Sequence, residues 1–359
     1  MWWPEGVDPR FDEREFATDP LYARVLELWP LVIRASWAVW GLGRRRTPRG
    51  DVLVVAVDAR VDPRLTGEVE QAYSGARRPL DRSIELLRRT LLRDASGASH
   101  RLPWDLVSSV HRTAGWSSPL RELDGLLPPS EGVELIFLPP PRPVAAFRIG
   151  PENSGRQALG TVGPRLVCDE RGPLVLTAGH VFPGLSPGQQ AEARIFGPGL
   201  MRLREIGSAR VEYSTESVGP EPGYDYALAA SSVSVLHVAA VDRTVGPPHV
   251  PTERQCTIRR GRGASRPGFI TDTVLDLVRG REVAGTSWAR CWLVTGRGGF
   301  AAEEGDSGSA VVLDDGALLG HLVAVTGWPF GRPEMGLVQD AWSVLQHAHY
   351  AFCPCLRFC

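Results

Sequence analysis

The spacing of apolar residues in the first third of the chain differs from their spacing in the rest. A helix is predicted to run from Leu21 with a kink at Pro30, and a second over Asp81 to Arg93, where apolar residues recur at helical spacing. Between them the β-branched run from Asp51 to Val57 predicts a buried strand. Residues 1–126 are therefore interpreted as a separate, smaller α/β module.

Tryptophan is concentrated in this module. Seven of the 11 tryptophans fall within it, and we expect Trp29, Trp37 and Trp40 on or near the buried side of the first helix. Such a concentration indicates either a real core or an adhesive face, of which the core is the preferred interpretation. The module carries no recognisable catalytic or metal-binding pattern.

A proline-rich stretch follows at residues 127–144. Six prolines surround the strand-like run from Val133 to Leu138. Because proline cannot continue a helix and stiffens the chain, the stretch is predicted to be a semi-rigid connector that contains the domain boundary.

Short strand candidates separated by turn residues dominate from Val144 onward, with no long helix until Asp340. That pattern is typical of an all-β barrel or sandwich. The strands form two groups, one from Gly160 to Ser231 and one from Gln255 to about Gln339. We expect a second domain over residues 145–350, followed by a cysteine-containing tail at 351–359.

The net charge and the hydropathy of the chain argue against some classes of binding partner. The formal net charge is −1, so nothing draws the whole chain toward nucleic acid or a membrane surface. The first twenty residues are acidic, unlike a secretory signal, and the apolar stretch from Leu21 to Leu42 is interrupted by charges and by Pro30. These features predict an intracellular protein that binds neither nucleic acid nor membrane.

The strongest chemical signal is Gly305-Asp306-Ser307-Gly308, a serine between glycines just before an apolar run. Glycine permits a tight turn, so the backbone N–H groups of Gly305 and Ser307 could point at one spot where an oxyanion would form. A plain turn leading into a strand could have the same sequence.

Two possible partners for the serine lie upstream. His180 ends the strand-like run that begins at Leu174, and Asp225 starts an apolar strand. A carboxylate at the head of a buried strand needs a partner because burying it unpaired is costly, and an imidazole N–H would serve. Each residue alone could be structural. Together, in the order His180, Asp225, Ser307, they indicate a base, an orienting acid and a nucleophile.

Three motifs resemble those of chymotrypsin/trypsin-fold serine peptidases: Thr177-Ala178-Gly179-His180, Asp225-Tyr226-Ala227-Leu228 and Gly305-Asp306-Ser307-Gly308. The segment from Arg259 to Ile270 resembles the opening hairpin of the second barrel in bacterial members. Gly336 to Leu345 resembles the last strand and closing helix. The resemblance covers about 145–350 and leaves residues 1 to about 140 unassigned.

The resemblance implies a double β-barrel whose active site lies between the barrels. His180 would be the general base, Asp225 its orienting acid, Ser307 the nucleophile, and the N–H groups of Gly305 and Ser307 the oxyanion hole. No metal or cofactor is implied. The pocket floor would be Ala301, which favours a small or medium apolar side chain at the cleaved position.

These residues predict a serine endopeptidase acting on polypeptide substrates, regulated inside a bacterial cell by an N-terminal module that can bind a protein partner. Cysteines are absent where secreted members of the family carry disulfides, which favours a reducing cytoplasm. The alternative is a catalytically inactive binding or adaptor module of the same fold.

Two further expectations concern single segments. No activating cleavage is expected, so the carboxylate of Asp306 should be held by an arginine, by backbone N–H groups or by water. Cys353, Cys355 and Cys359 could bind a metal or form a redox contact, but a frayed, oxidisable terminus is the preferred interpretation.

Overall fold

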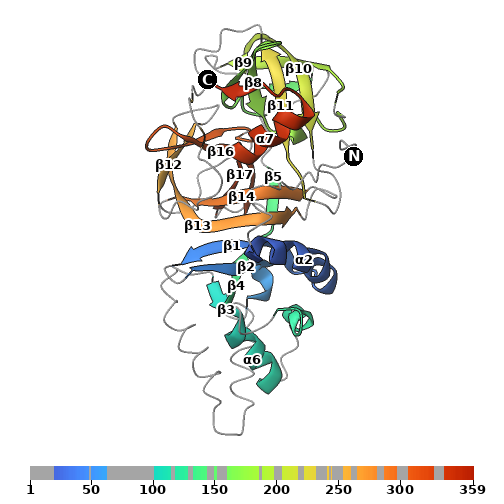
Figure 1. Cartoon of the computed structure of the whole chain (residues 1–359), viewed down its shortest axis with the longest axis vertical. Helices are drawn as coiled ribbons and strands as arrows, with labels where there is room; N and C mark the ends of the chain where they lie inside the picture. The colour runs from blue at the N-terminus through green and yellow to red at the C-terminus, as the bar shows by residue number, and fades with distance from the viewer. Residues whose placement is uncertain are drawn as a thin grey trace. The chain divides into compact units, whose positions relative to one another are not determined.

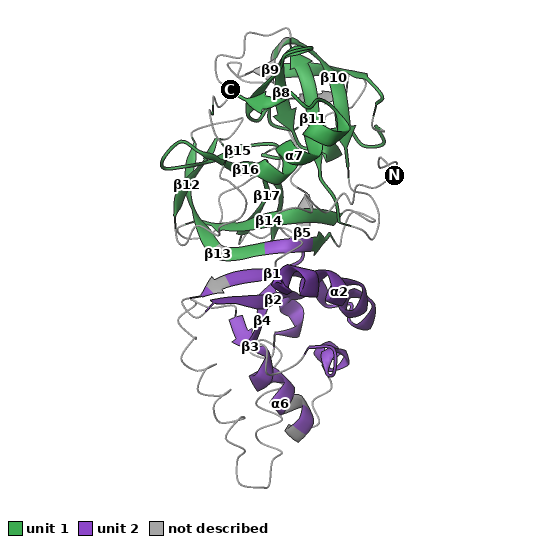
Figure 2. Cartoon of the chain, viewed as in Figure 1, with its two compact units in different colours: residues 1–18, 141–274, 278–359 green, residues 19–140, 275–277 purple. Residues whose placement is uncertain are grey.

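The computed structural model describes part of the 359-residue chain (Figure 1). The described residues are 20–47, 50–62, 101–114, 118–127, 132–143, 149–151, 160–185, 188–197, 204–216, 222–231, 241, 244, 254–259, 265–280, 287–296, 306–326 and 335–359. The helix predicted over Asp81 to Arg93, the pocket position Ala301 and the oxyanion-hole position Gly305 lie outside them. The described residues form two compact units, coloured separately in Figure 2.

The smaller unit takes in residues 19–140 together with 275–277. Its strands run in the order β1-β2-β4-β3, with β1 antiparallel to β2, β2 parallel to β4, and β4 antiparallel to β3. Its elements are α2 (Pro20–Ala35), β1 (Val39–Thr47), β2 (Gly50–Asp58), η1 (Ala59–Val61), β3 (Arg101–Pro103), α6 (Trp104–Ala114), η3 (Pro119–Leu123) and β4 (Val133–Leu138).

Helix α2 passes through Pro30 and buries Trp29 in the core of this unit. The expectation that Trp37 and Trp40 share that face is wrong. The chain leaves the helix at Ser36, whose hydroxyl accepts the N–H of Ala38 (3.3 Å) and ends the helical spacing. Trp37 is consequently 52% exposed, and Trp40 is buried in β1.

The proline-rich stretch contributes strands to both units. Val133–Leu138 forms β4, between β2 and β3, because its apolar side chains are buried there. Pro141–Pro143 forms β5, which pairs with β16 of the larger unit. The division between the units falls at Pro140, inside the predicted connector.

The larger unit contains a closed barrel. Its six strands run in the order β12-β15-β16-β17-β14-β13, and β13 pairs back onto β12. Closure removes the free sheet edges and encloses a core of apolar side chains. The strands are β12 (Gln255–Arg259), β13 (Arg266–Arg279), β14 (Ser287–Thr295), β15 (Ala310–Leu313), β16 (Leu318–Thr326) and β17 (Met335–Asp340).

A second sheet of seven strands completes this unit, in the order β18-β7-β8-β11-β10-β9-β6. Asp340 caps the N-terminus of helix α7 (Ala341–Ala351), because its carboxylate accepts the N–H of Ser343. The apolar side chains of the helix pack with residues of both sheets. The strands are β6 (Ile149–Pro151), β7 (Arg165–Cys168), β8 (Gly172–Thr177), β9 (Ala191–Gly197), β10 (Arg204–Thr215), β11 (Tyr226–Ser231) and β18 (Arg357–Phe358).

The predicted fold class is confirmed: a double β-barrel architecture preceded by a smaller α/β module. The predicted fraying of the tail is wrong, because β18 pairs with β7 and the side chains of Cys353, Leu356 and Phe358 are buried. Within the described residues, no helix combines the length and apolarity needed to cross a membrane.

Candidate active site

His180 is delivered by the end of β8. The strand stops at Thr177, and the single turn η5 (Gly179–Val181) carries the histidine. Gly179 is required for this turn, because a Cβ there would lie 2.0 Å from the carbonyl oxygen of Thr215 and 3.0 Å from Asp225 Oδ1. Because glycine has no Cβ, the N–H of His180 can reach Asp225 Oδ1 at 2.8 Å.

Asp225 lies just before β11 and is fully buried. Its Oδ2 atom lies 2.6 Å from His180 Nδ1 and accepts a second hydrogen bond from Trp288 Nε1 at 2.8 Å. Oδ1 accepts the backbone N–H of His180, so both carboxylate oxygens have donors. Complete pairing of this kind is what a buried charge needs.

The electrostatics keep Asp225 ionised. Burial is the largest effect and raises the pKa of Asp225, but the charge of His180 and hydrogen bonds from His180 and Trp288 outweigh it, so the pKa lies below its ordinary value. The carboxyl group of Glu216 is also affected by the charges of Asp225 and His180. Burial first, and the charge of Asp225 second, raise the pKa of Glu216.

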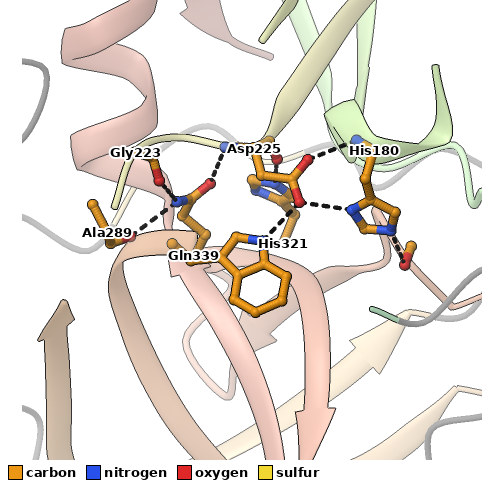
Figure 3. A network of polar contacts seen from close by, with 8 residues as sticks. His180, Gly223, Asp225, Ala289, His321 and Gln339 are labelled. Carbon is orange, nitrogen blue, oxygen red and sulfur yellow. Dashed lines mark hydrogen bonds and ion pairs between the residues drawn. The ribbon is translucent and has the colours of Figure 1, made fainter. Parts of the chain in front are cut away.

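The backbone of Asp225 is fixed as firmly as its side chain (Figure 3). Its N–H donates to Gln339 Oε1 (2.8 Å), and its carbonyl oxygen accepts from His321 Nε2 (2.8 Å). Gln339 in turn donates to the carbonyl oxygens of Gly223 (3.0 Å) and Ala289 (2.9 Å). Two strands of the closed barrel thus clamp the acid that starts β11.

His321 holds its hydrogen bond as a neutral ring. Burial lowers the pKa of His321 to about 4, and the charge of His180 acts in the same direction. The backbone carbonyl and the negative charge of Asp225 oppose the shift without cancelling it. Since Nε2 faces a carbonyl oxygen, Nε2 must carry the proton of the neutral imidazole.

Ser307 approaches His180 from the other sheet, just before β15. Its Oγ lies 2.8 Å from His180 Nε2. The turn around it is tied down by Thr161 N–H to Ser307 O (2.6 Å) and by Gly308 N–H to Leu322 O (2.8 Å). Gly308 has φ +88, and a Cβ there would lie 2.4 Å from the carbonyl oxygen of Thr161, so only glycine fits.

The three side chains form one hydrogen-bonded chain. An ionised Asp225 can only accept, so His180 Nδ1 donates to it and Nε2 of the neutral ring is left to accept the Ser307 hydroxyl proton. This is the arrangement that activates a serine nucleophile. The structure therefore brings together the three residues singled out in the sequence. Asp306 is buried beside them, and the partner predicted for its carboxylate stays a prediction.

Sequence reasoning missed Trp288, His321 and Gln339. They contact Asp225 across 63, 96 and 114 residues of sequence, and none falls in a recognisable motif. One irregularity marks the segment that carries Trp288: Arg290 has φ 51, in the left-handed region that arginine rarely occupies. Residues from Cys291 onward pair with β17, whereas Ala289 N–H reaches Gly223 O at 2.7 Å. The left-handed residue separates these two pairings.

Comparisons with known proteins add only a faint likeness. No family model matches the chain, and no curated protein matches it. Among solved structures, the active form of the Rv3671c protease from M. tuberculosis aligns at 18% identity and TM-score 0.34 over 55% of this chain and 78% of that one. The MamO protease domain from Magnetospirillum magneticum aligns at 21% and 0.33, over 57% and 96%.

A glutamic acid specific serine protease aligns at 13% identity and TM-score 0.37, over 55% of this chain and 94% of that one. The fold of the present chain is assigned from its own strand order and barrel closure.

Trp288→Phe is predicted to slow the reaction of Ser307 with a serine-directed fluorophosphonate about tenfold. The variant loses one hydrogen bond to a buried carboxylate, a bond type that contributes about 1.5–3 kcal/mol, so His180 is held less firmly. Stopped-time labelling at neutral pH measures the rate.

Trp292→Phe is the matched control. Trp292 lies on the same strand and donates its Nε1 to another buried carboxylate, that of Asp340 (2.9 Å). The Trp292→Phe variant should lose about as much stability as Trp288→Phe, while its Ser307 reacts at the wild-type rate. Equal rates in the two variants would refute a positioning role for Trp288.

His321→Gln is predicted to flatten the pH dependence of stability. The folded-state pKa of His321, about 4, lies below its ordinary value of 6.5, so between those values the unfolded chain binds more protons and acidification favours unfolding. Stability therefore rises from pH 4 to 6.5 and levels off above. Wild type should lose about 2 kcal/mol more than the variant between pH 7 and pH 5. Urea unfolding at each pH measures this; identical slopes would contradict it.

Proposed function

We propose that the chain is a serine endopeptidase that cleaves polypeptide substrates through Ser307, His180 and Asp225. The observation that carries the proposal is the hydrogen-bonded chain from Asp225 Oδ2 through both His180 ring nitrogens to Ser307 Oγ. Such a series of hydrogen bonds activates a serine, since serine is a poor nucleophile until a positioned base removes its proton.

In the first half of the reaction, Ser307 Oγ attacks the carbonyl carbon of a peptide bond while its proton moves to His180 Nε2. Asp225 stabilises the resulting imidazolium without taking a proton, which its lowered pKa favours. The N–H groups of Gly305 and Ser307 are proposed to hold the oxyanion, each donor contributing about 3–4 kcal/mol.

In the second half, the imidazolium gives its proton to the leaving amine, and the C–N bond breaks to leave an acyl group on Ser307. A water molecule, deprotonated by His180 Nε2, then attacks the ester and regenerates the hydroxyl. These steps need no metal or cofactor.

The N-terminal module is proposed to recruit or control the peptidase by binding a protein partner. Its own apolar core, assembled from α2, α6 and the β1-β2-β4-β3 sheet, supports an independently folded role. An intracellular bacterial setting is part of the proposal, supported by six cysteines that are all free. Labelling of fractionated cells tests the location: a signal confined to the cell exterior would oppose it.

Ser307→Ala is predicted to abolish fluorophosphonate labelling and peptide hydrolysis while the protein stays folded. The side chain is small and fully buried, and the turn is held by backbone hydrogen bonds that alanine keeps. Labelling of wild type and variant, with circular dichroism as the folding control, gives the readout.

Two results would overturn the proposed peptidase activity, and a third would overturn the role proposed for the N-terminal module. Persistent labelling of the alanine variant would place the nucleophile elsewhere. Absence of labelling in folded wild type would favour the inactive adaptor alternative. Mass spectrometry of the labelled species should find the full-length chain; label confined to a fragment beginning near Ile149 would make the N-terminal module a propeptide.

A further inference from the structure

Three cysteine side chains converge where the C-terminal segment meets β7. Cys168 is the last residue of β7, whereas Cys353 and Cys355 follow α7. The Sγ atoms of all three lie within 4.8 Å of one another. Cys355 Sγ is 3.0 Å from Cys353 Sγ and 3.7 Å from Cys168 Sγ.

The backbone holds this cluster in place. After α7, the N–H of Cys353 donates to the carbonyl oxygen of Ala348 (3.0 Å), and the chain turns back toward β7. Strand β18 then pairs antiparallel with β7, with Arg357 opposite Val167 and Phe358 opposite Leu166. The sulfurs therefore come from two segments that main-chain hydrogen bonds already fix side by side.

The spacing of the sulfurs suits a metal ion. Zinc binds thiolates at about 2.3 Å in a tetrahedron, which places sulfur atoms about 3.8 Å apart. The observed Sγ–Sγ separations are 3.0 and 3.7 Å, and the third is no more than 4.8 Å, so the three sulfurs lie close enough to share one ion. A disulfide, with sulfurs about 2.05 Å apart, would use only two of the three.

The surroundings also suit thiolate ligands. Cys168 and Cys353 are buried, and Cys355 is half-buried, so an ion could enter from the side of Cys355. The backbone N–H groups of Asp169 and Glu170 hydrogen-bond to the sulfur of Cys355. Backbone donors of this kind orient and stabilise metal-bound sulfur.

We propose that Cys168, Cys353 and Cys355 bind one Zn²⁺ ion as three thiolates, with water in the fourth position. Within the described part of the chain, no further histidine, cysteine or carboxylate joins this group. Binding would release the thiol protons and fasten the C-terminal segment to β7. An ion that binds only the folded chain adds to its stability.

The test uses the full-length chain, reduced, stripped with a chelator and kept free of oxygen. Co²⁺ serves as the spectroscopic probe, because thiolate ligands give it a sulfur-to-metal charge-transfer absorption. We expect one equivalent of Co²⁺ to produce this absorption, Zn²⁺ to displace it, and added Zn²⁺ to raise the unfolding temperature.

Cys355→Ser and Cys168→Ser should each weaken Zn²⁺ binding by more than about 100-fold, beyond what loss of an outer-shell partner costs. Cys256→Ala is the matched control, since Cys256 is another buried free cysteine, on β12, outside the group. It should bind Zn²⁺ like wild type.

Any of three outcomes would overturn the proposal: Co²⁺ bound without the charge-transfer band, serine variants that bind Zn²⁺ as tightly as wild type, or no binding by the reduced wild-type chain. In that last case, a disulfide mapped among these cysteines in the chain before reduction would assign the cluster to redox chemistry. None of these outcomes bears on labelling of Ser307, so this site and the proposed peptidase activity stand or fall separately.

Discussion

The arrangement of the site depends on burying one carboxylate with both of its oxygens hydrogen-bonded. Asp225 is fully buried, and its two oxygens accept three hydrogen bonds from His180 and Trp288. An unpaired charge in that place would cost several kcal/mol. The pairing keeps Asp225 ionised, which dictates that His180 Nδ1 donates and that Nε2 faces Ser307.

The two sheets of the larger unit share this task. The seven-stranded sheet supplies His180 and Asp225 at strand ends, while the closed barrel supplies Ser307 together with Trp288, His321 and Gln339. Turns carry the three residues of the proposed active site, and strands carry those that hold them. A rigid barrel can place Gln339 and His321 on the backbone of Asp225 because every strand in it is paired on both sides.

Local sequence patterns singled out the three residues that the structure brings together and predicted the strands around them. Each of these signals depends on a few neighbouring residues: a strand end for His180, a strand start for Asp225, a glycine turn for Ser307. Long-range contacts could not be predicted in this way. Trp288 and Gln339 reach Asp225 across 63 and 114 residues, with no motif to mark them. The helical spacing of tryptophans after α2 gave a wrong prediction for Trp37 and Trp40, because the helix ends at a turn at Ser36. At the C-terminus, pairing of β18 with a strand far upstream gave order to a segment that its composition did not predict.

The central claim is that the ionised carboxylate of Asp225 sets the orientation and the proton position of His180. Its most direct test is the rate at which a fluorophosphonate labels Asp225→Asn at neutral pH, in protein shown to be folded by circular dichroism. An amide can donate a hydrogen bond to Nδ1 and so place the ring proton on Nε2, where it can no longer accept from Ser307. We expect the labelling rate to fall about 10⁴-fold. A folded Asp225→Asn protein that labels near the wild-type rate would contradict it.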